Sequence, residues 1–343
     1  MKKAVILFNL GGPDKLENVK PFLFNLFNDP AILNLPTFLR YPLAKIISNR
    51  RTPIAKKIYE ELGGSSPILR LTQDQANALD KNLNENDKIK YKSFVAMRCW
   101  HPRAEDVLEN VKEFNPDEII LLPLYPQYSA ATSGSSIREW NDICKKKNYK
   151  VKTSTICCYP VEDNFINAHI KKIHQKIKDI KNFKLIFSAH GLPEKNIKKG
   201  DPYQWQVEQS VKKIVNNLNI DNLDWILSYQ SRVGPLKWIG PSTDEIIIEN
   251  SKIGKHIILV PIAFVSEHSE TLVELDIEYK KLAENNGCKQ YTRISALGTN
   301  EIFIKSLSKL VLNKEENKLN DYLYPPKIQC PTKFKKCPCL NYE

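Results

Sequence analysis

Several features that would assign a class at once are missing from this chain of 343 residues. No apolar run approaches the roughly 20 residues of a membrane-spanning helix, which excludes an integral membrane protein of that kind. The apolar stretch that follows Lys2 and Lys3 covers only residues 4–8, which is too short for the apolar region of a signal peptide. We therefore expect a protein of the cytoplasm.

Two common ligand signatures are also missing. The first expected strand ends in Gly11-Gly12-Pro13, which is not the GxGxxG fingerprint, so the sequence predicts no NAD site. No aromatic-basic repeat and no known nucleic-acid module is present, so we expect no nucleic-acid partner. The net charge of +12 still favours anionic partners, such as an acidic membrane surface or a substrate that carries carboxylates.

Expected strands and helices alternate along most of the chain. Short β-branched runs predict buried parallel strands at 4–8, 91–97, 118–122, 151–157, 184–187, 225–228 and 257–260. The pattern restarts near residue 149. It predicts an α/β fold with two similar doubly wound (Rossmann-like) domains, each a parallel sheet flanked by helices, with a cleft between them. We assign 1–148 plus 299–314 to the first domain, 149–298 to the second, and 315–343 to a tail.

The strand at 257–260 leads into a predicted helix, 266–282, with two distinct faces. Leu272, Leu275, Tyr279 and Leu282 form an apolar face, and Glu267, Glu270, Glu274 and Glu278 form an acidic one. Like charges at this spacing repel one another, so the acidic row needs a reason. One reason is a divalent metal, with His268 beside it; the other is a solvated helix face.

His190 ends the predicted strand at 184–187, and Glu270 follows another strand of the same domain. Ligands bind at the carboxyl ends of strands in open α/β sheets, so these two side chains are expected to face each other. An imidazole and a carboxylate bind a divalent ion or remove a proton from a substrate. A site with so few strong ligands suits a metal that is passed on and not stored.

Aromatic and apolar residues are expected at the same strand ends. Flat apolar walls with cations at the rim fit a large aromatic ligand that bears carboxylates, although ordinary core packing also explains each aromatic side chain. The residues of this predicted pocket are Leu10, Tyr125, Tyr128, Tyr203 and Trp238, with Arg98 and the Ser/Thr residues of 129–136 as donors.

Residues 22–51 mix apolar and basic side chains and contain Pro30, Pro36 and Pro42. The prolines exclude one long helix, so we predict two short helices that face the core. The same mixture also predicts the lip of an apolar pocket that makes peripheral contact with a membrane surface.

These motifs resemble the ferrochelatase family over roughly residues 3–310. The resemblance rests on Gly11-Gly12-Pro13, on the loops at 63–68 and 123–128, on 187–193, on 228–241 and on 260–279. It implies that Fe²⁺ is inserted into protoporphyrin IX to give haem and two protons. A coproporphyrin ferrochelatase or another tetrapyrrole chelatase shares these motifs, and a non-catalytic porphyrin or haem carrier is a further alternative. The oligomeric state stays open.

The resemblance also implies roles for individual residues. His190 and Glu270 match the family's essential pair at the porphyrin centre, where Fe²⁺ is the substrate metal. Glu274 and Glu278 match a path for metal or protons, on a helix with a π-type widening. His268 matches a residue that supports Glu270. The porphyrin-binding residues it implies are Leu10, Arg98, Tyr128 and Trp238.

Three of the eight cysteines crowd the tail, at Cys330, Cys337 and Cys339. Cysteines in a cytosolic chain are more often thiols or metal ligands than disulfides. Similarity to family members with C-terminal cysteines implies a [2Fe–2S] cluster, which needs a fourth ligand. Cys157 and Cys158 are the alternatives, and we favour Cys158. Zinc and free thiols are the competing interpretations.

Overall fold

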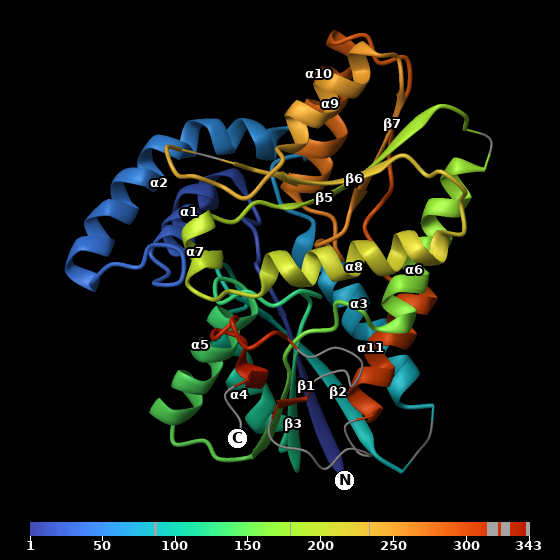
Figure 1. Cartoon of the computed structure of the whole chain (residues 1–343). Helices are drawn as coiled ribbons and strands as arrows, with labels where there is room; N and C mark the ends of the chain where they lie inside the picture. The colour runs from blue at the N-terminus through green and yellow to red at the C-terminus, as the bar shows by residue number, and fades with distance from the viewer. Residues whose placement is uncertain (86–87, 179, 233, 314–321, 324–329, 341–343) are drawn as a thin grey trace. The chain divides into compact units, whose positions relative to one another are not determined.

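Each half of the protein is built on its own parallel sheet (Figure 1). The computed structural model describes residues 1–85, 88–178, 180–232, 234–313, 322–323 and 330–340. Contacts divide the chain into unit 1, Met1–Cys158 with Leu307–Tyr324, and unit 2, Tyr159–Ser306 with Pro325–Glu343. The α/β fold with parallel sheets flanked by helices is therefore confirmed.

Unit 1 contains a sheet in the order β2-β1-β3-β4-β9, with every pair parallel. Its strands are β1 (Lys2–Asn9), β2 (Lys90–Met97), β3 (Glu118–Pro123), β4 (Lys152–Ile156) and the short β9 (Tyr322–Leu323). Its helical elements are η1 (Leu16–Asn18), α1 (Val19–Phe27), α2 (Thr37–Glu60), α3 (Ile68–Leu83), α4 (Ala104–Phe114) and α5 (Ser133–Lys146).

Strand alternation explains how this sheet is covered. Ala4, Ile6 and Phe8 point to one face, where they form a core with apolar residues of α4 and α5. Phe8 packs edge-on against the buried Trp140 of α5, with ring centroids 6.2 Å apart. The parallel register brings the ends of β1, β2 and β3 to one edge, and the loops that follow them leave from that edge.

Unit 2 has the strand order β6-β5-β7-β8, again all parallel. The strands are β5 (Phe183–His190), β6 (Trp225–Gln230), β7 (His256–Pro261) and β8 (Tyr291–Arg293). The helical elements are α6 (Asp163–Ile177), α7 (Glu194–Lys198), α8 (Tyr203–Leu218), α9 (Thr243–Lys252), the π-helix η2 (Glu270–Glu278), α10 (Tyr279–Asn285) and the 3₁₀ turn η3 (Pro338–Leu340).

The contact-based borders differ from the predicted domain limits. Residues 151–157 were assigned to the second domain, but β4 pairs with β3 and extends the first sheet. The border therefore lies after Cys158, about ten residues later, and a second border falls inside α11 (Glu301–Asn313). In the predicted tail, residues 315–321, 324–329 and 341–343 lie outside the described residues.

The prediction that prolines break the segment 22–51 into short helices is wrong for α2. This helix runs for 24 residues through Pro42 and Pro53. Each proline removes one backbone hydrogen bond inside the helix, and both prolines are exposed, so water can bond the carbonyl oxygen that loses its helical partner. None of the described helices is long and apolar enough to cross a membrane.

Candidate active site

The polar residues of the site come from the carboxyl ends of neighbouring strands in unit 2. Pairing of β5 with β6 sets His190 beside Gln230, and pairing of β5 with β7 sets Ser188 beside Pro261. The chain that follows β7 then turns into η2. Parallel pairing therefore gathers the ends of three strands and the start of a helix at one edge of the sheet.

His190 is held from two sides. Its Nδ1 lies 2.6 Å from the carbonyl oxygen of Gly191, and the Tyr203 hydroxyl donates to the His190 carbonyl oxygen at 3.0 Å. The first bond fixes the proton of the neutral ring on Nδ1, so the lone pair is on Nε2. Nε2 lies 3.6 Å from Oε1 of Glu270, and both side chains are partly exposed. The structure thus brings together the two residues that the sequence singles out.

His268 supports Glu270 through the backbone. The Glu270 N–H donates to Nδ1 of His268 at 3.0 Å, so that nitrogen carries no proton. The ring packs edge-on against Phe264, with centroids 4.7 Å apart. Burial lowers the pKa of His268, although the nearby Glu270 and Glu267 carboxylates act against this shift. A neutral His268 therefore sets the first turn of η2.

The acidic row lies on a π-helix, as the resemblance implies. The Tyr279 N–H reaches the carbonyl oxygen of Glu274, five residues back, which is the hydrogen bond of a π-helix. Glu270 and Glu274 are partly buried, and Glu278 is exposed. The row therefore runs from the site to solvent.

Glu267 does not belong to this row, contrary to the helical pattern. The helix begins after it, and Arg293 of β8 donates to both of its carboxylate oxygens, at 2.7 and 2.9 Å. Arg293 also pairs with Asp276. Sequence reasoning missed β8 and hence Arg293, because a strand of three residues gives no periodic signal.

Glu274 is the most heavily bonded carboxylate of the site. It accepts hydrogen bonds from the N–H of Ser231 at 2.9 Å, the Ser231 hydroxyl at 2.6 Å, Nε2 of Gln230 at 3.1 Å and the Tyr279 hydroxyl at 3.1 Å. Burial raises the pKa of Glu274, and the charge of Glu270 raises it further. The polar residues at the end of β6 indicate that Gln230 and Ser231 lie at the ligand-binding edge of the sheet. No sequence pattern indicates that their partner is Glu274.

Trp238 lies close to His190 through Gly191. A Cβ at Gly191 would meet the Gln230 carbonyl oxygen at 2.9 Å and Cε3 of Trp238 at 3.1 Å. Pro193 and Trp238 also form an isolated β-bridge. Only glycine fits between these groups, so position 191 lets the indole approach the residue next to His190.

The other predicted pocket residues belong to unit 1. Leu10 and Arg98 follow neighbouring strands, and the Cys99 N–H donates to the Leu10 carbonyl oxygen at 2.8 Å. Leu10 packs with Val19, Phe22 and Cys99 in a small apolar core. Tyr128 is buried, and its hydroxyl lies over Gly134 at the start of α5, where a Cβ would be 2.5 Å away.

Arg98 is held by acidic partners within unit 1. Its guanidinium pairs with the buried Asp29 at 2.9 Å and with Glu139 at 3.1 Å, and it donates to Ser135 at 2.7 Å. Cys99 beside it is buried, and burial raises the pKa of its thiol to about 12. Arg98 therefore connects Asp29 to Ser135 and Glu139 of α5 within unit 1.

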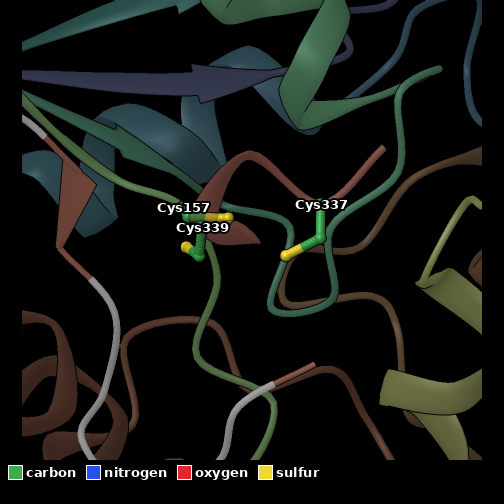
Figure 2. Close-up of side chains that lie close together, drawn as sticks. All are labelled: Cys157, Cys337 and Cys339. Carbon is green, nitrogen blue, oxygen red and sulfur yellow. The ribbon is translucent and has the colours of Figure 1, made fainter. Parts of the chain in front are cut away.

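The tail cysteines occur in a folded cluster, as Figure 2 shows in part. Cys330 and Cys337 form a core with Phe334, whose ring lies 5.8 Å from that of Trp205. A hydrogen bond with the Cys337 thiol, together with burial, raises the pKa of Cys330. The sulfur atoms of Cys157, Cys337 and Cys339 lie within 4.8 Å of one another. This group contains Cys157, whereas the sequence-based choice was Cys158.

Solved structures of similar fold include two forms of a bacterial chelatase. SirB from Bacillus subtilis with Fe³⁺ has a TM-score of 0.55 and 14% identity, over 94% of this chain and 100% of that one. The sirohydrochlorin chelatase SirB from Bacillus subtilis subspecies spizizenii with cobalt has a TM-score of 0.53 at 14% identity, over 93% and 97%. The fold is thus the two-domain α/β fold of chelatases.

Sequence comparisons narrow this class to one family. The ferrochelatase family model matches residues 2–315. A ferrochelatase of Pelagibacter ubique (strain HTCC1062) is 77% identical over 100% of both chains. One of Rickettsia bellii (strain OSU 85-389) is 50% identical over 98% of this chain and 95% of its own. The chain belongs to the ferrochelatase family. It is a metal chelatase of the lyase class that inserts iron into a porphyrin for haem synthesis.

Proposed function

We propose that the porphyrin is protoporphyrin IX and that His190 and Glu270 act at its centre on substrate Fe²⁺. The observation that carries this proposal is the approach of His190 Nε2 to Glu270 Oε1, 3.6 Å, at the ligand-binding edge of the sheet. The Nε2 lone pair accepts a pyrrole proton or binds the incoming Fe²⁺. Two pyrrole protons leave as Fe²⁺ enters, so the charge of the macrocycle is unchanged.

The acidic row provides an exit for the positive charge that this reaction releases. Glu274 and Glu278 follow Glu270 along η2 and lead from partly buried to exposed positions. Carboxylates accept protons and bind Fe²⁺ only weakly when they act singly, so neither species is trapped. His268 keeps Glu270 in place through the backbone bond.

For the porphyrin we propose contacts with Leu10, Arg98, Tyr128 and Trp238. Trp238 offers an indole next to the residue that follows His190, and the apolar Leu10 offers a wall. Arg98 already has two carboxylate partners, so a porphyrin carboxylate would share its guanidinium with Asp29 and Glu139.

The direct test is anaerobic incubation with protoporphyrin IX and Fe²⁺ while the haem spectrum is recorded. We expect His190→Ala and Glu270→Gln each to lower turnover by orders of magnitude in a folded protein, because both lose a proton or metal acceptor. His174→Ala, at an exposed position of α6, is the control and should keep full turnover.

Each alternative gives a different result in the same experiment. Mass spectrometry that finds iron only in coproporphyrin III identifies a coproporphyrin ferrochelatase. Tight porphyrin binding with no metal insertion identifies a carrier. Near-normal turnover in either site variant overturns the role of that residue.

We propose that the cysteine group holds a [2Fe–2S] cluster on Cys157, Cys330, Cys337 and Cys339. The cysteine side chains fit a [2Fe–2S] cluster, because thiolates are the ligands of such clusters. The sulfur atoms of three of them lie within 4.8 Å of one another. A bound cluster would supply one-electron chemistry and fasten the tail. Anaerobically purified protein should be brown, with about two irons and two sulfides per chain. A colourless protein with stoichiometric zinc overturns the cluster and leaves the chelatase function unaffected.

We also propose that the protein is cytoplasmic and makes peripheral contact with an anionic membrane through α2. This helix exposes Phe38, Tyr41 and Ile54 at 75%, 53% and 64%, and it carries the basic residues Arg50 and Arg51. Exposed apolar side chains together with basic ones suit contact with an anionic headgroup layer.

Liposome flotation with anionic lipids at low salt tests this contact. We expect salt-sensitive binding, and each arginine replaced by glutamine should weaken it about five-fold, from about 1 kcal/mol per basic residue at such a surface. Lys146→Gln on α5 should have no effect. Absence of binding at low salt would remove the proposal.

A further inference from the structure

The four hydrogen bonds to Glu274 come entirely from neutral groups. Two are from Ser231 and one each from Gln230 and Tyr279. Among the described residues, no lysine or arginine pairs with this carboxylate. A partly buried carboxylate is normally stabilised by a cation, so the neutral donors must hold Glu274 by geometry.

Ser231 contributes two donors because of its backbone conformation. Its φ of +59° lies in the left-handed region, which a serine adopts only where its surroundings require it. In this conformation its N–H and its hydroxyl both reach the Glu274 carboxylate, one to each oxygen. The backbone N–H of Ser231 can only donate, so Oε1 of Glu274 always faces a donor.

The amide oxygen of Gln230 is held by a chain of buried hydroxyl groups. Ser188 donates to Oε1 of Gln230 at 2.8 Å, and its oxygen lies 3.0 Å from the Thr243 hydroxyl. The Thr243 hydroxyl lies 2.9 Å from that of Ser228. Ser228 is also 3.3 Å from the Phe187 carbonyl oxygen, to which its hydroxyl donates. Because each hydroxyl has one proton, donation from Ser188 to Gln230 leaves the Ser188 oxygen to accept from Thr243.

The Glu274 carboxylate gives the amide of Gln230 its orientation, because it accepts the hydrogen bond that the NH₂ donates. The carbonyl oxygen of the amide faces Ser188, and its NH₂ faces Glu274 at 3.1 Å. The reversed amide would set its oxygen against the carboxylate oxygen of Glu274. Ser188, Ser228 and Thr243 are fully buried, so water does not compete for these bonds.

We infer that Gln230 and Ser231 are positioning residues that hold Glu274 behind the His190–Glu270 pair, ready to receive positive charge during metal insertion. This inference rests on the proposed function of that pair. The hydroxyl chain through Thr243 holds the amide oxygen of Gln230, so that the NH₂ of the same amide stays at Glu274. The carboxylate then needs no movement when a metal ion or proton reaches it.

A double-mutant cycle tests whether Gln230 acts through Glu274. Gln230→Leu should lower kcat about ten-fold or more at saturating Fe²⁺ and porphyrin, the loss expected for a hydrogen bond to a charged group. In the Glu274→Gln background the same change should have little further effect, because the residue it positions is gone. Binding of the porphyrin, followed by fluorescence quenching, should stay within two-fold of wild type, roughly the scatter of additive effects.

Three further variants separate positioning from general stability. Thr243→Val should lower kcat in the same direction as Gln230→Leu, and Thr243→Ser should restore it because the hydroxyl returns. Ser210→Ala removes a buried hydroxyl on α8 outside this chain and should leave kcat unchanged. If Gln230→Leu does not fold, Ser231→Gly repeats the cycle, since glycine accepts the left-handed backbone.

The outcomes distinguish this inference from the proposed function. An active wild type with additive effects of Gln230→Leu and Glu274→Gln overturns the positioning role alone. The same holds if Thr243→Ser fails to restore what Thr243→Val loses. A wild type that inserts no iron into any porphyrin overturns the proposed function, and the inference falls with it.

Discussion

Replacement of His169 by leucine should make the protein less sensitive to acid. His169 lies in α6 with 1% of its surface exposed and packs edge-on against Phe165, with centroids 5.0 Å apart. Its Nε2 has no hydrogen-bond partner within the part of the chain that the structure describes. Burial therefore favours the neutral ring and lowers the pKa of His169 to about 3, with a smaller contribution from Lys172.

The direction of the change in stability with pH follows from the pKa of His169 in the folded and in the unfolded chain. In the unfolded chain a histidine has a pKa of about 6.5, so the unfolded state binds the proton first as pH falls. The contribution of His169 to stability is complete above about pH 6.5 and is lost progressively as pH falls toward 3. At pH 5 the loss covers about 1.5 pH units at 1.36 kcal/mol each, or roughly 2 kcal/mol.

Urea unfolding at pH 7 and pH 5 measures this loss. Wild type should lose roughly 2 kcal/mol more unfolding free energy between these pH values than His169→Leu does. His174→Leu, at an exposed position of the same helix, should behave as wild type. Equal losses in wild type and His169→Leu would refute the reasoning. They would mean that the ring of His169 takes up no proton when the protein unfolds at pH 5.

Two further predictions concern the site and the tail. Gly191→Ala should lower stability by about 1–3 kcal/mol and raise the KM for porphyrin, because the new Cβ meets Cε3 of Trp238 at 3.1 Å and a backbone oxygen at 2.9 Å; an unchanged KM and melting temperature would contradict this. Cys157→Ser should bleach the brown colour of anaerobically purified protein, whereas Cys158→Ser should keep it, and the reverse result would restore Cys158 as the fourth ligand.

The sequence predicts the longer strands of both sheets well because buried parallel strands leave continuous apolar runs, whereas the short β8 and β9 give no such signal. The expected strand 257–260 is β7, and its polar exit becomes the acidic part of the site. Strand order then decides which loops meet. His190 and Glu270 come together for this reason, and the sequence alone gives enough to expect it.

What the sequence does not give are contacts that depend on tertiary packing. Glu267 has the helical spacing of the acidic row, yet Arg293, which is 26 residues later, takes it into an ion pair. Gln230 bonds Glu274 across 44 residues, and no local pattern signals this. The choice between Cys157 and Cys158 has the same origin, since neighbours leave a strand on opposite faces and only packing selects one.

The whole protein and its acidic row have charges of opposite sign, and each sign suits one of the two substrates, the porphyrin and Fe²⁺. The protein as a whole has a net charge of +12, which draws an anionic porphyrin toward it. The acidic row is locally negative, because none of the described basic residues pairs with Glu270, Glu274 or Glu278 except the histidine of the site. A cation is therefore attracted by the acidic row, and the partly buried Glu270 and Glu274 are screened less by salt than exposed carboxylates are. In the proposed site, one imidazole and one carboxylate are the nearest ligands of Fe²⁺, and so small a ligand set would hold the ion weakly enough for it to leave for the porphyrin.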